Sequence, residues 1–209
     1  MSFRSVLRNF VGLAGLAALA AGCYWSARLA WADYLFRLDS LESVSRAAQL
    51  VPANAEYHER LAMLLDTNAA DGAAVESELR QAVAANPRLA AVWIELGLRA
   101  EAAGNPQEAQ ADLVRAAEVD RMYATLWTLA NFYFRQNAPE KFWPATKRAL
   151  RAGSVDTYDP APLFRLCWKV SANPATVLER AIPDAGPVDA RYLEFSGPGK
   201  SHWGCRPGY

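Results

Sequence analysis

Two tryptophans that lie 34 residues apart constrain the fold of this chain more than any other feature. Trp93 and Trp127 each open a segment in which apolar residues recur at helical spacing. The first segment ends at the turn Gly104-Asn105-Pro106, and a second helical segment follows, marked by Ala109, Leu113 and Ala116. A fixed period of this length is typical of stacked helical repeats. The pattern therefore predicts an all-α fold built from recurring pairs of helices.

The period extends in both directions. Leu79 and Ala82 precede Leu113 and Ala116 by 34 residues, whereas Ala149 follows Ala116 by 33, which implies one deletion. The first helix of the upstream unit is marked by Tyr57, His58, Leu61 and Ala62. The second helix of a leading half unit is marked by Leu41, Val44 and Ala47.

These residues resemble the tetratricopeptide repeat pattern, Trp-x2-Leu-Gly-x2-Tyr followed by Ala-x3-Phe. The matching residues are Trp93, Leu96, Gly97 and Ala109, with Ala100 at the usual aromatic position and Leu113 at that of the later Phe. The resemblance covers roughly residues 39–153. It implies an α-solenoid of helix-turn-helix repeats over 33–153, with further helices over 154–195 that extend or cap it.

The resemblance also implies a groove for protein partners, lined by the first helix of each repeat. By register, the groove residues are Glu59, Met63, Ile94, Leu98, Glu101, Thr128, Phe132 and Arg135. They combine apolar and charged groups, as a peptide-binding surface requires. The alternative is that Ile94, Leu98 and Phe132 pack against neighbouring repeats, and the sequence leaves both interpretations open. Gly97 is expected to let the two helices of its repeat approach closely.

Several helix starts are marked by an Asx residue and a proline. Asn105-Pro106, with Glu108 three residues after the cap, predicts the start of a helix. Asp159-Pro160, Asn173-Pro174 and Pro187 predict three further helices beyond the repeats.

An apolar run near the amino terminus predicts a membrane anchor over residues 1–32. Residues 10–27 are uncharged, and 18 residues of helix span roughly 27 Å, enough for a bilayer core. Arg4 and Arg8 precede the run, and Trp25 and Trp31 follow it as an interfacial aromatic belt would. This arrangement predicts a single span in the bacterial cytoplasmic membrane, with a cytoplasmic amino terminus and periplasmic repeats.

A second interpretation is lipidation at Cys23. Leu19-Ala20-Ala21-Gly22-Cys23 resembles the lipobox of bacterial lipoproteins, although Ala20 stands where that motif prefers leucine. The sequence after Cys23 is apolar and helix-like rather than a polar tether, which favours the uncleaved anchor. A buried soluble helix is disfavoured because such a helix normally shows a polar stripe.

Composition argues against several functions. Residues 1–32 carry three arginines and no acid, and the remaining 19 basic and 22 acidic residues balance to −3, so no cationic nucleic-acid surface is expected. Three scattered cysteines and two histidines predict no metal site, and no cofactor or small-molecule substrate is expected. His58 and Cys167 are expected to be packed structural residues, so the chain is not expected to be an enzyme.

Four further segments each allow more than one interpretation. Residues 66–72 hint at a calcium loop but fit a helix-to-helix turn better, and Gly199-Lys200-Ser201 lacks the strand and first glycine of a phosphate loop. The basic run of Lys141, Lys147, Arg148 and Arg151 fits a solvated helix face, with anionic lipid as the alternative. The irregular tail, 196–209, is either natural or the product of a truncated or frame-shifted reading.

Together these observations predict a membrane-anchored protein-interaction scaffold of the bacterial cell envelope. The alternatives are a docking arm for an envelope polysaccharide or secretion enzyme system whose catalytic part lies elsewhere, and an outer-membrane lipoprotein with the same repeats.

Overall fold

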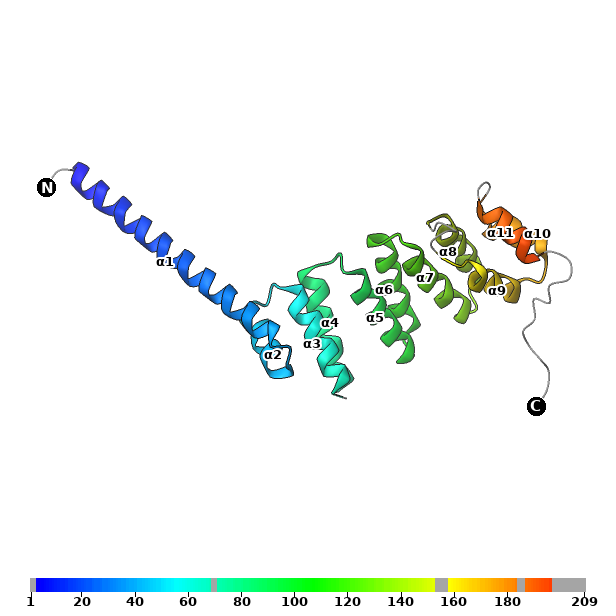
Figure 1. Cartoon of the computed structure of the whole chain (residues 1–209), viewed down its shortest axis with the longest axis horizontal. Coiled ribbons are helices and arrows are strands. Elements are labelled where there is room, and N and C mark those ends of the chain that lie inside the picture. Colours follow the sequence, from blue (N-terminus) through cyan, green and yellow to red (C-terminus); the bar gives the residue numbers. More distant parts are fainter. Residues whose placement is uncertain (1–2, 69–70, 153–157, 184–186, 197–209) are drawn as a thin grey trace. The chain divides into compact units, whose positions relative to one another are not determined.

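The structure, a computed structural model, describes residues 3–68, 71–152, 158–183 and 187–196, and every regular element in these ranges is an α-helix (Figure 1). The helices are α1 (Phe3–Arg37), α2 (Leu41–Leu50), α3 (Ala55–Thr67), α4 (Gly72–Ala85), α5 (Ala90–Ala102), α6 (Pro106–Val119), α7 (Tyr123–Arg135), α8 (Pro139–Ala152), α9 (Ala161–Val170), α10 (Pro174–Ala181) and α11 (Pro187–Ser196). They form two compact units, Met1–Pro87 and Arg88–Tyr209.

Successive helices pair into antiparallel hairpins, as the 34-residue period predicts. The closest pairings join α3 to α4, α5 to α6, and α7 to α8. Within each unit a hairpin also packs on the next helix, through α2 with α3 in the first unit and α6 with α7 in the second. The fold is an all-α solenoid of tetratricopeptide-like repeats.

The buried positions of the second helices follow the predicted register. Ala82, Ala116 and Ala149 each have no exposed surface. Two turns earlier, Val75 and Ala109 correspond to Phe142, which is likewise fully buried. The single-residue deletion inferred between α6 and α8 is therefore compatible with continuous packing.

The carboxyl-terminal part of α1 belongs to the first hairpin. The repeat pattern in the sequence predicts only the second helix of this hairpin, as a half unit. Ala32 and Leu35 are 0% and 7% exposed, and they share a core with Val44 of α2. Arg28 donates a hydrogen bond through Nε to the carbonyl oxygen of Leu50 at 2.8 Å. The expected boundary between residues 32 and 33 thus falls inside one unbroken helix, because the stripe at 28, 32 and 35 continues the helical period past the apolar run.

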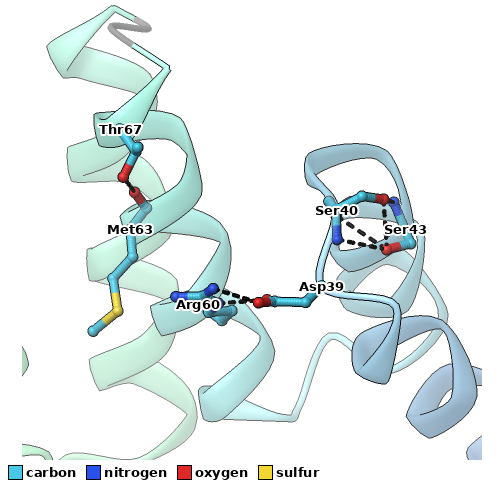
Figure 2. Close-up of polar contacts among 6 residues, drawn as sticks. All are labelled: Asp39, Ser40, Ser43, Arg60, Met63 and Thr67. Atoms are coloured by element: carbon cyan, nitrogen blue, oxygen red, sulfur yellow. Dashed lines mark hydrogen bonds and ion pairs between the residues drawn. The ribbon is translucent and has the colours of Figure 1, made fainter.

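A tight turn joins α1 to α2 (Figure 2). Asp39 has a φ of 52°, in the left-handed region that a short polar side chain tolerates. Ser40 caps α2: its hydroxyl accepts from the backbone N–H of Ser43 at 3.2 Å, while the Ser43 hydroxyl accepts from that of Ser40 at 3.1 Å. This reciprocal pair fixes the start of α2.

Gly97 brings α5 and α6 together as predicted. A Cβ at position 97 would lie 2.7 Å from Cγ of Leu113 and 3.2 Å from the carbonyl oxygen of Ala109. The second unit has one continuous hydrophobic core, which includes the aromatic side chains of Phe132, Phe142, Phe164 and Tyr192.

The predicted helix starts are largely confirmed. The helix expected at Asn105-Pro106 is α6, which begins at Pro106, although the Asn105 side chain makes no cap hydrogen bond. Asn173 does cap α10, accepting from the N–H of Ala175 at 3.0 Å. The helices expected after Asp159-Pro160 and at Pro187 are α9 and α11.

Candidate functional site

The predicted groove residues occupy equivalent positions on the first helices of successive hairpins. Glu59, Ile94 and Thr128 form one row, and Met63, Leu98 and Phe132 form a second row one turn later. The first member of each row lies in the first unit and the others lie in the second, so the two parts of the candidate site are described separately.

In the first unit, Met63 is the exposed apolar member of the site. Its side chain is 50% exposed on α3, and its backbone carbonyl accepts a hydrogen bond from Thr67 at 2.8 Å (Figure 2). Glu59 lies one turn earlier and is partly buried. Burial, reinforced by the nearby Glu56 carboxylate, raises the pKa of Glu59 above its ordinary value.

An ion pair beside Met63 ties α3 to the turn after α1. Arg60 donates through Nε and a terminal nitrogen to the two carboxylate oxygens of Asp39, both at 2.6 Å (Figure 2). The paired hydrogen bonds hold the pKa of the Asp39 carboxyl below its ordinary value. Nothing in the spacing of positions 39 and 60 indicated this contact, because it depends on the left-handed backbone at Asp39.

In the second unit, Leu98 is the exposed apolar member. It is 38% exposed on α5, whereas Ile94 and Thr128 are partly buried. Ile94 packs against the core, and the Thr128 hydroxyl donates to the backbone carbonyl of Ala124 at 2.9 Å. Leu98 therefore offers the apolar contact of this part of the site.

The two charged residues predicted for this part bind each other. Arg135 of α7 donates to both carboxylate oxygens of Glu101 on α5, at 2.9 and 2.6 Å, and Gln136 donates to the same carboxylate at 3.2 Å. These hydrogen bonds lower the pKa of Glu101 and raise that of Arg135. The pair presents a nearly neutral polar edge next to Leu98 rather than two separate charges.

Phe132 does not line an open surface. Its side chain is 1% exposed within the core of the second unit, with its ring 5.5 Å from that of Tyr133. The alternative weighed from the sequence, packing against neighbouring helices, describes this residue. Phe132 belongs to the continuous core of the second unit, which includes Phe142 of α8 and Leu163 of α9, and the repeat register alone does not predict this burial.

The basic run on α8 makes several contacts within the second unit. Lys141 donates to the side-chain oxygen of Gln110 at 2.7 Å, and its ammonium lies 5.9 Å from the ring centre of Tyr133. Arg148 donates to the carbonyl of Ala117 at 3.3 Å, and Lys147 to that of Glu179 at 3.4 Å. These side chains link α8 to its neighbours instead of forming an unpartnered cationic patch.

The histidine and the cysteine chosen as structural residues are buried. His58 is 3% exposed, with Nδ1 2.7 Å from a carboxylate oxygen of Glu78 and Nε2 3.1 Å from the carbonyl of Pro52. Cys167 is fully buried, and burial raises the pKa of its thiol to about 12, which disfavours the nucleophilic thiolate. Asp71 caps α4 by accepting from the N–H of Ala73, as a helix-to-helix turn requires.

Over the ranges that the structure covers, no group of three or more His, Cys, Asp or Glu side chains is placed to hold a metal ion. The phosphate-loop candidate at 199–201 and most of the tail lie outside those ranges.

The sequence matches no family model and no curated protein sequence. The solved structures that resemble the chain include two tetratricopeptide-repeat proteins. The crystal structure of MamA is 19% identical with a TM-score of 0.47, covering 54% of this chain and 66% of that one. PilF of Pseudomonas aeruginosa is 18% identical with a TM-score of 0.48, covering 74% of this chain and 68% of that one.

This chain thus spans about two thirds of the length of each of the two structures. With identities below 20% and TM-scores below 0.5, these likenesses carry no argument about this chain. The assignment of the repeats rests on the helix pairing and register described above.

One helix in the described part of the chain is long and apolar enough to cross a bilayer. It covers Gly12–Arg37, with a mean hydropathy of 1.2 in its most apolar window. The buried core helix of a soluble protein can also reach this value, but here none of the window is buried. Cys23 lies within this helix as an exposed, free thiol.

Proposed function

We propose that this chain is a membrane-anchored scaffold of the bacterial cell envelope that binds other proteins and has no catalytic role of its own. One observation carries the proposal: an apolar helix with a wholly exposed window continues without a break into helical hairpins that present apolar side chains at a repeated position. The first feature suits a bilayer and the second suits a protein partner.

The anchoring part of the proposal rests on α1. An apolar window with no buried side chain needs a nonaqueous environment, because exposure of so much apolar surface to water is unfavourable. Arg4 and Arg8 before the run favour a cytoplasmic amino terminus and repeats in the periplasm.

The binding part rests on Met63 and Leu98. They occupy equivalent positions on α3 and α5, and both are exposed, whereas every other large apolar residue of those helices is at least partly buried. Leu98 lies on the same helix as Glu101, whose carboxylate is shared by Arg135 and Gln136. An apolar anchor beside hydrogen-bonding groups suits the side chains of an amphipathic partner helix or an extended peptide.

Site-specific crosslinking tests the binding part. A photoreactive amino acid at position 98 or 63 in membrane-embedded protein is expected to crosslink a discrete partner. Leu98→Glu and Met63→Glu are expected to reduce recovery of that partner about tenfold or more, the scale of a lost apolar anchor. Matched controls are Met122→Glu and Leu178→Glu, at 68% and 45% exposed positions that were not assigned to the groove.

The folded state of each variant is checked by circular dichroism in detergent. Undiminished recovery from folded Leu98→Glu and Met63→Glu proteins would contradict the assignment of the groove. An equal loss in the Met122→Glu and Leu178→Glu controls would also contradict it, because the effect would then not belong to this face.

Lipid attachment through Cys23 is a second candidate for the anchor, because the thiol is exposed after the segment that resembles a lipobox. Against it, α1 continues as one helix to Arg37, with no polar tether after Cys23. Retention of a palmitate label that is lost in Cys23→Ala would replace the transmembrane anchor by a lipid anchor and leave the binding proposal intact.

A further inference from the structure

Beyond the apolar run, α1 presents two different faces. On one face Ala32 and Leu35 are buried against the rest of the first hairpin. On the other, Trp31 and Tyr34 are 56% and 53% exposed, at the i, i+3 spacing that places them side by side. Their rings stack with centroids 5.4 Å apart, so they form one aromatic surface.

The charged groups of this part of α1 are engaged elsewhere. Arg28 directs its guanidinium to the carbonyl of Leu50, at the carboxyl-terminal end of α2, where the helix dipole is negative. Asp33 and Arg37 form an i, i+4 ion pair at 2.8 Å. The surface made by Trp31 and Tyr34 therefore lies between an apolar span and a charged helix end without carrying a charge itself.

Helical rise places this surface at the edge of a bilayer. If the hydrocarbon core ends near Arg28, Trp31 lies about 4–5 Å and Tyr34 about 9 Å farther along the axis. The headgroup region adds about 5–8 Å on each side of the core, and spanning helices tilt by about 20° on average. A tilt toward the aromatic face thus brings both rings into the region that Trp and Tyr favour.

We propose that the aromatic surface of Trp31 and Tyr34 lies in the headgroup region of the membrane, so that the first hairpin rests directly on the bilayer. The occupant of this face is lipid. The inference rests on the proposed anchoring of α1 and adds the orientation of the hairpin. Because Ala32 and Leu35 pack α1 against α2, the anchor and the first hairpin share one helix with no linker between them.

Adjacent positions on α1 provide a matched test. Asp33 and Tyr34 differ in depth by about 1.5 Å, the rise of one residue, but lie on different faces. Both are partly exposed, with values of 51% for the Asp33 side chain and 53% for Tyr34, so Asp33→Cys and Tyr34→Cys are expected to fold. The background carries Cys23→Ser and Cys205→Ser, and Cys167 is kept because it is fully buried.

Each full-length variant is labelled with bimane and reconstituted into vesicles of phosphatidylcholine and phosphatidylglycerol. Lipids brominated near the headgroup end of the acyl chain quench only labels that lie near the boundary of the hydrocarbon core. They are therefore expected to quench the label at position 34 about threefold or more as strongly as the label at position 33. Iodide in the buffer is expected to show the reverse order. Trp31→Cys is expected to behave as position 34 does.

Three results would overturn the inference, and each has a different meaning. Equal iodide quenching at positions 33 and 34 in protein that resists carbonate extraction would leave the anchor intact and place the aromatic face in water. Protection of position 34 from both quenchers would mean that protein, such as a second copy, covers it. Loss of the chain from vesicles in carbonate would remove the anchoring proposal as well.

Discussion

Gly97 determines how closely the two helices of the second unit's first hairpin approach. Every other position on the buried face of α5 carries a side chain, and Leu113 of α6 occupies the space that a Cβ at position 97 would need. Phe132 illustrates the opposite case: it has the register of Leu98, yet it is buried in the core of the second unit. A residue's role in this fold thus depends on what packs over it as well as on its place in the repeat.

We expect Gly97→Ala to destabilise the second unit by about 1–2 kcal/mol. Overpacking at 2.7 Å costs roughly 1–3 kcal/mol, and the better helix propensity of alanine returns about 0.5–1 kcal/mol. The measurement is urea unfolding in detergent, followed by circular dichroism.

Two further variants isolate the cause. Gly72→Ala, where nothing lies within 4 Å of the added Cβ, is the control and is expected to be neutral or stabilising. Because Leu113 supplies the closest atoms, Gly97→Ala and Leu113→Ala should be clearly less than additive. Full additivity would show that the two helices do not meet at this point.

At the scale of elements, polar contacts between first helices complement the apolar packing. The Arg135–Glu101 pair joins α7 to α5, and the Arg60–Asp39 pair joins α3 to the turn after α1. Both are partly solvent-exposed. The Arg135–Glu101 pair contributes modestly, on the scale of about 0–1 kcal/mol for surface ion pairs, and the more exposed Arg60–Asp39 pair contributes little. The main effect of both ion pairs is to align consecutive hairpins.

The Glu101 carboxylate gives the second unit an acid-sensitive contact. Its pKa is lower in the folded chain than its ordinary value of 4.5, so its contribution is present above that value and is lost as the pH falls through the folded pKa. We expect Glu101→Gln to lower stability at pH 7 by about 0.5–1 kcal/mol, discounted for the exposure of Arg135.

This deficit should shrink as the pH is lowered below 4.5, because the wild-type carboxylate is then protonated as well. Urea titrations of both proteins at several pH values measure it. A deficit that is independent of pH would attribute the effect to lost packing and not to the charge.

At the scale of the whole molecule, α1 combines an apolar segment with a helix of the first hairpin, two parts that the sequence pattern separates at residue 32. Its apolar part has the length and exposure of a membrane span, and its carboxyl-terminal turns complete the first hairpin. In the proposed anchored state, the candidate binding surfaces lie on one side of the membrane.

We expect alkaline phosphatase fused after Ala152 to be active in a bacterial host, because the enzyme folds only after export. Arg4→Glu with Arg8→Glu should reduce the exported fraction, since these residues supply the positive charge that retains the amino terminus. A fluorescent protein fused at the same site should stay dark. Bright fluorescence with inactive phosphatase would reverse the proposed orientation.

The sequence by itself determined the helices, their pairing and the buried face of each second helix. These features depend on the 34-residue period and on Asx-proline helix starts, which are encoded in residues close together along the chain. The tertiary structure decided contacts between parts of the chain that the repeat pattern does not connect: the burial of Phe132 in the core of the second unit, the Arg60–Asp39 contact, and the packing of α1 on α2. None of these contacts has a periodic signal in the sequence. Each depends on the direction in which a turn leads the chain and on which helices pack together.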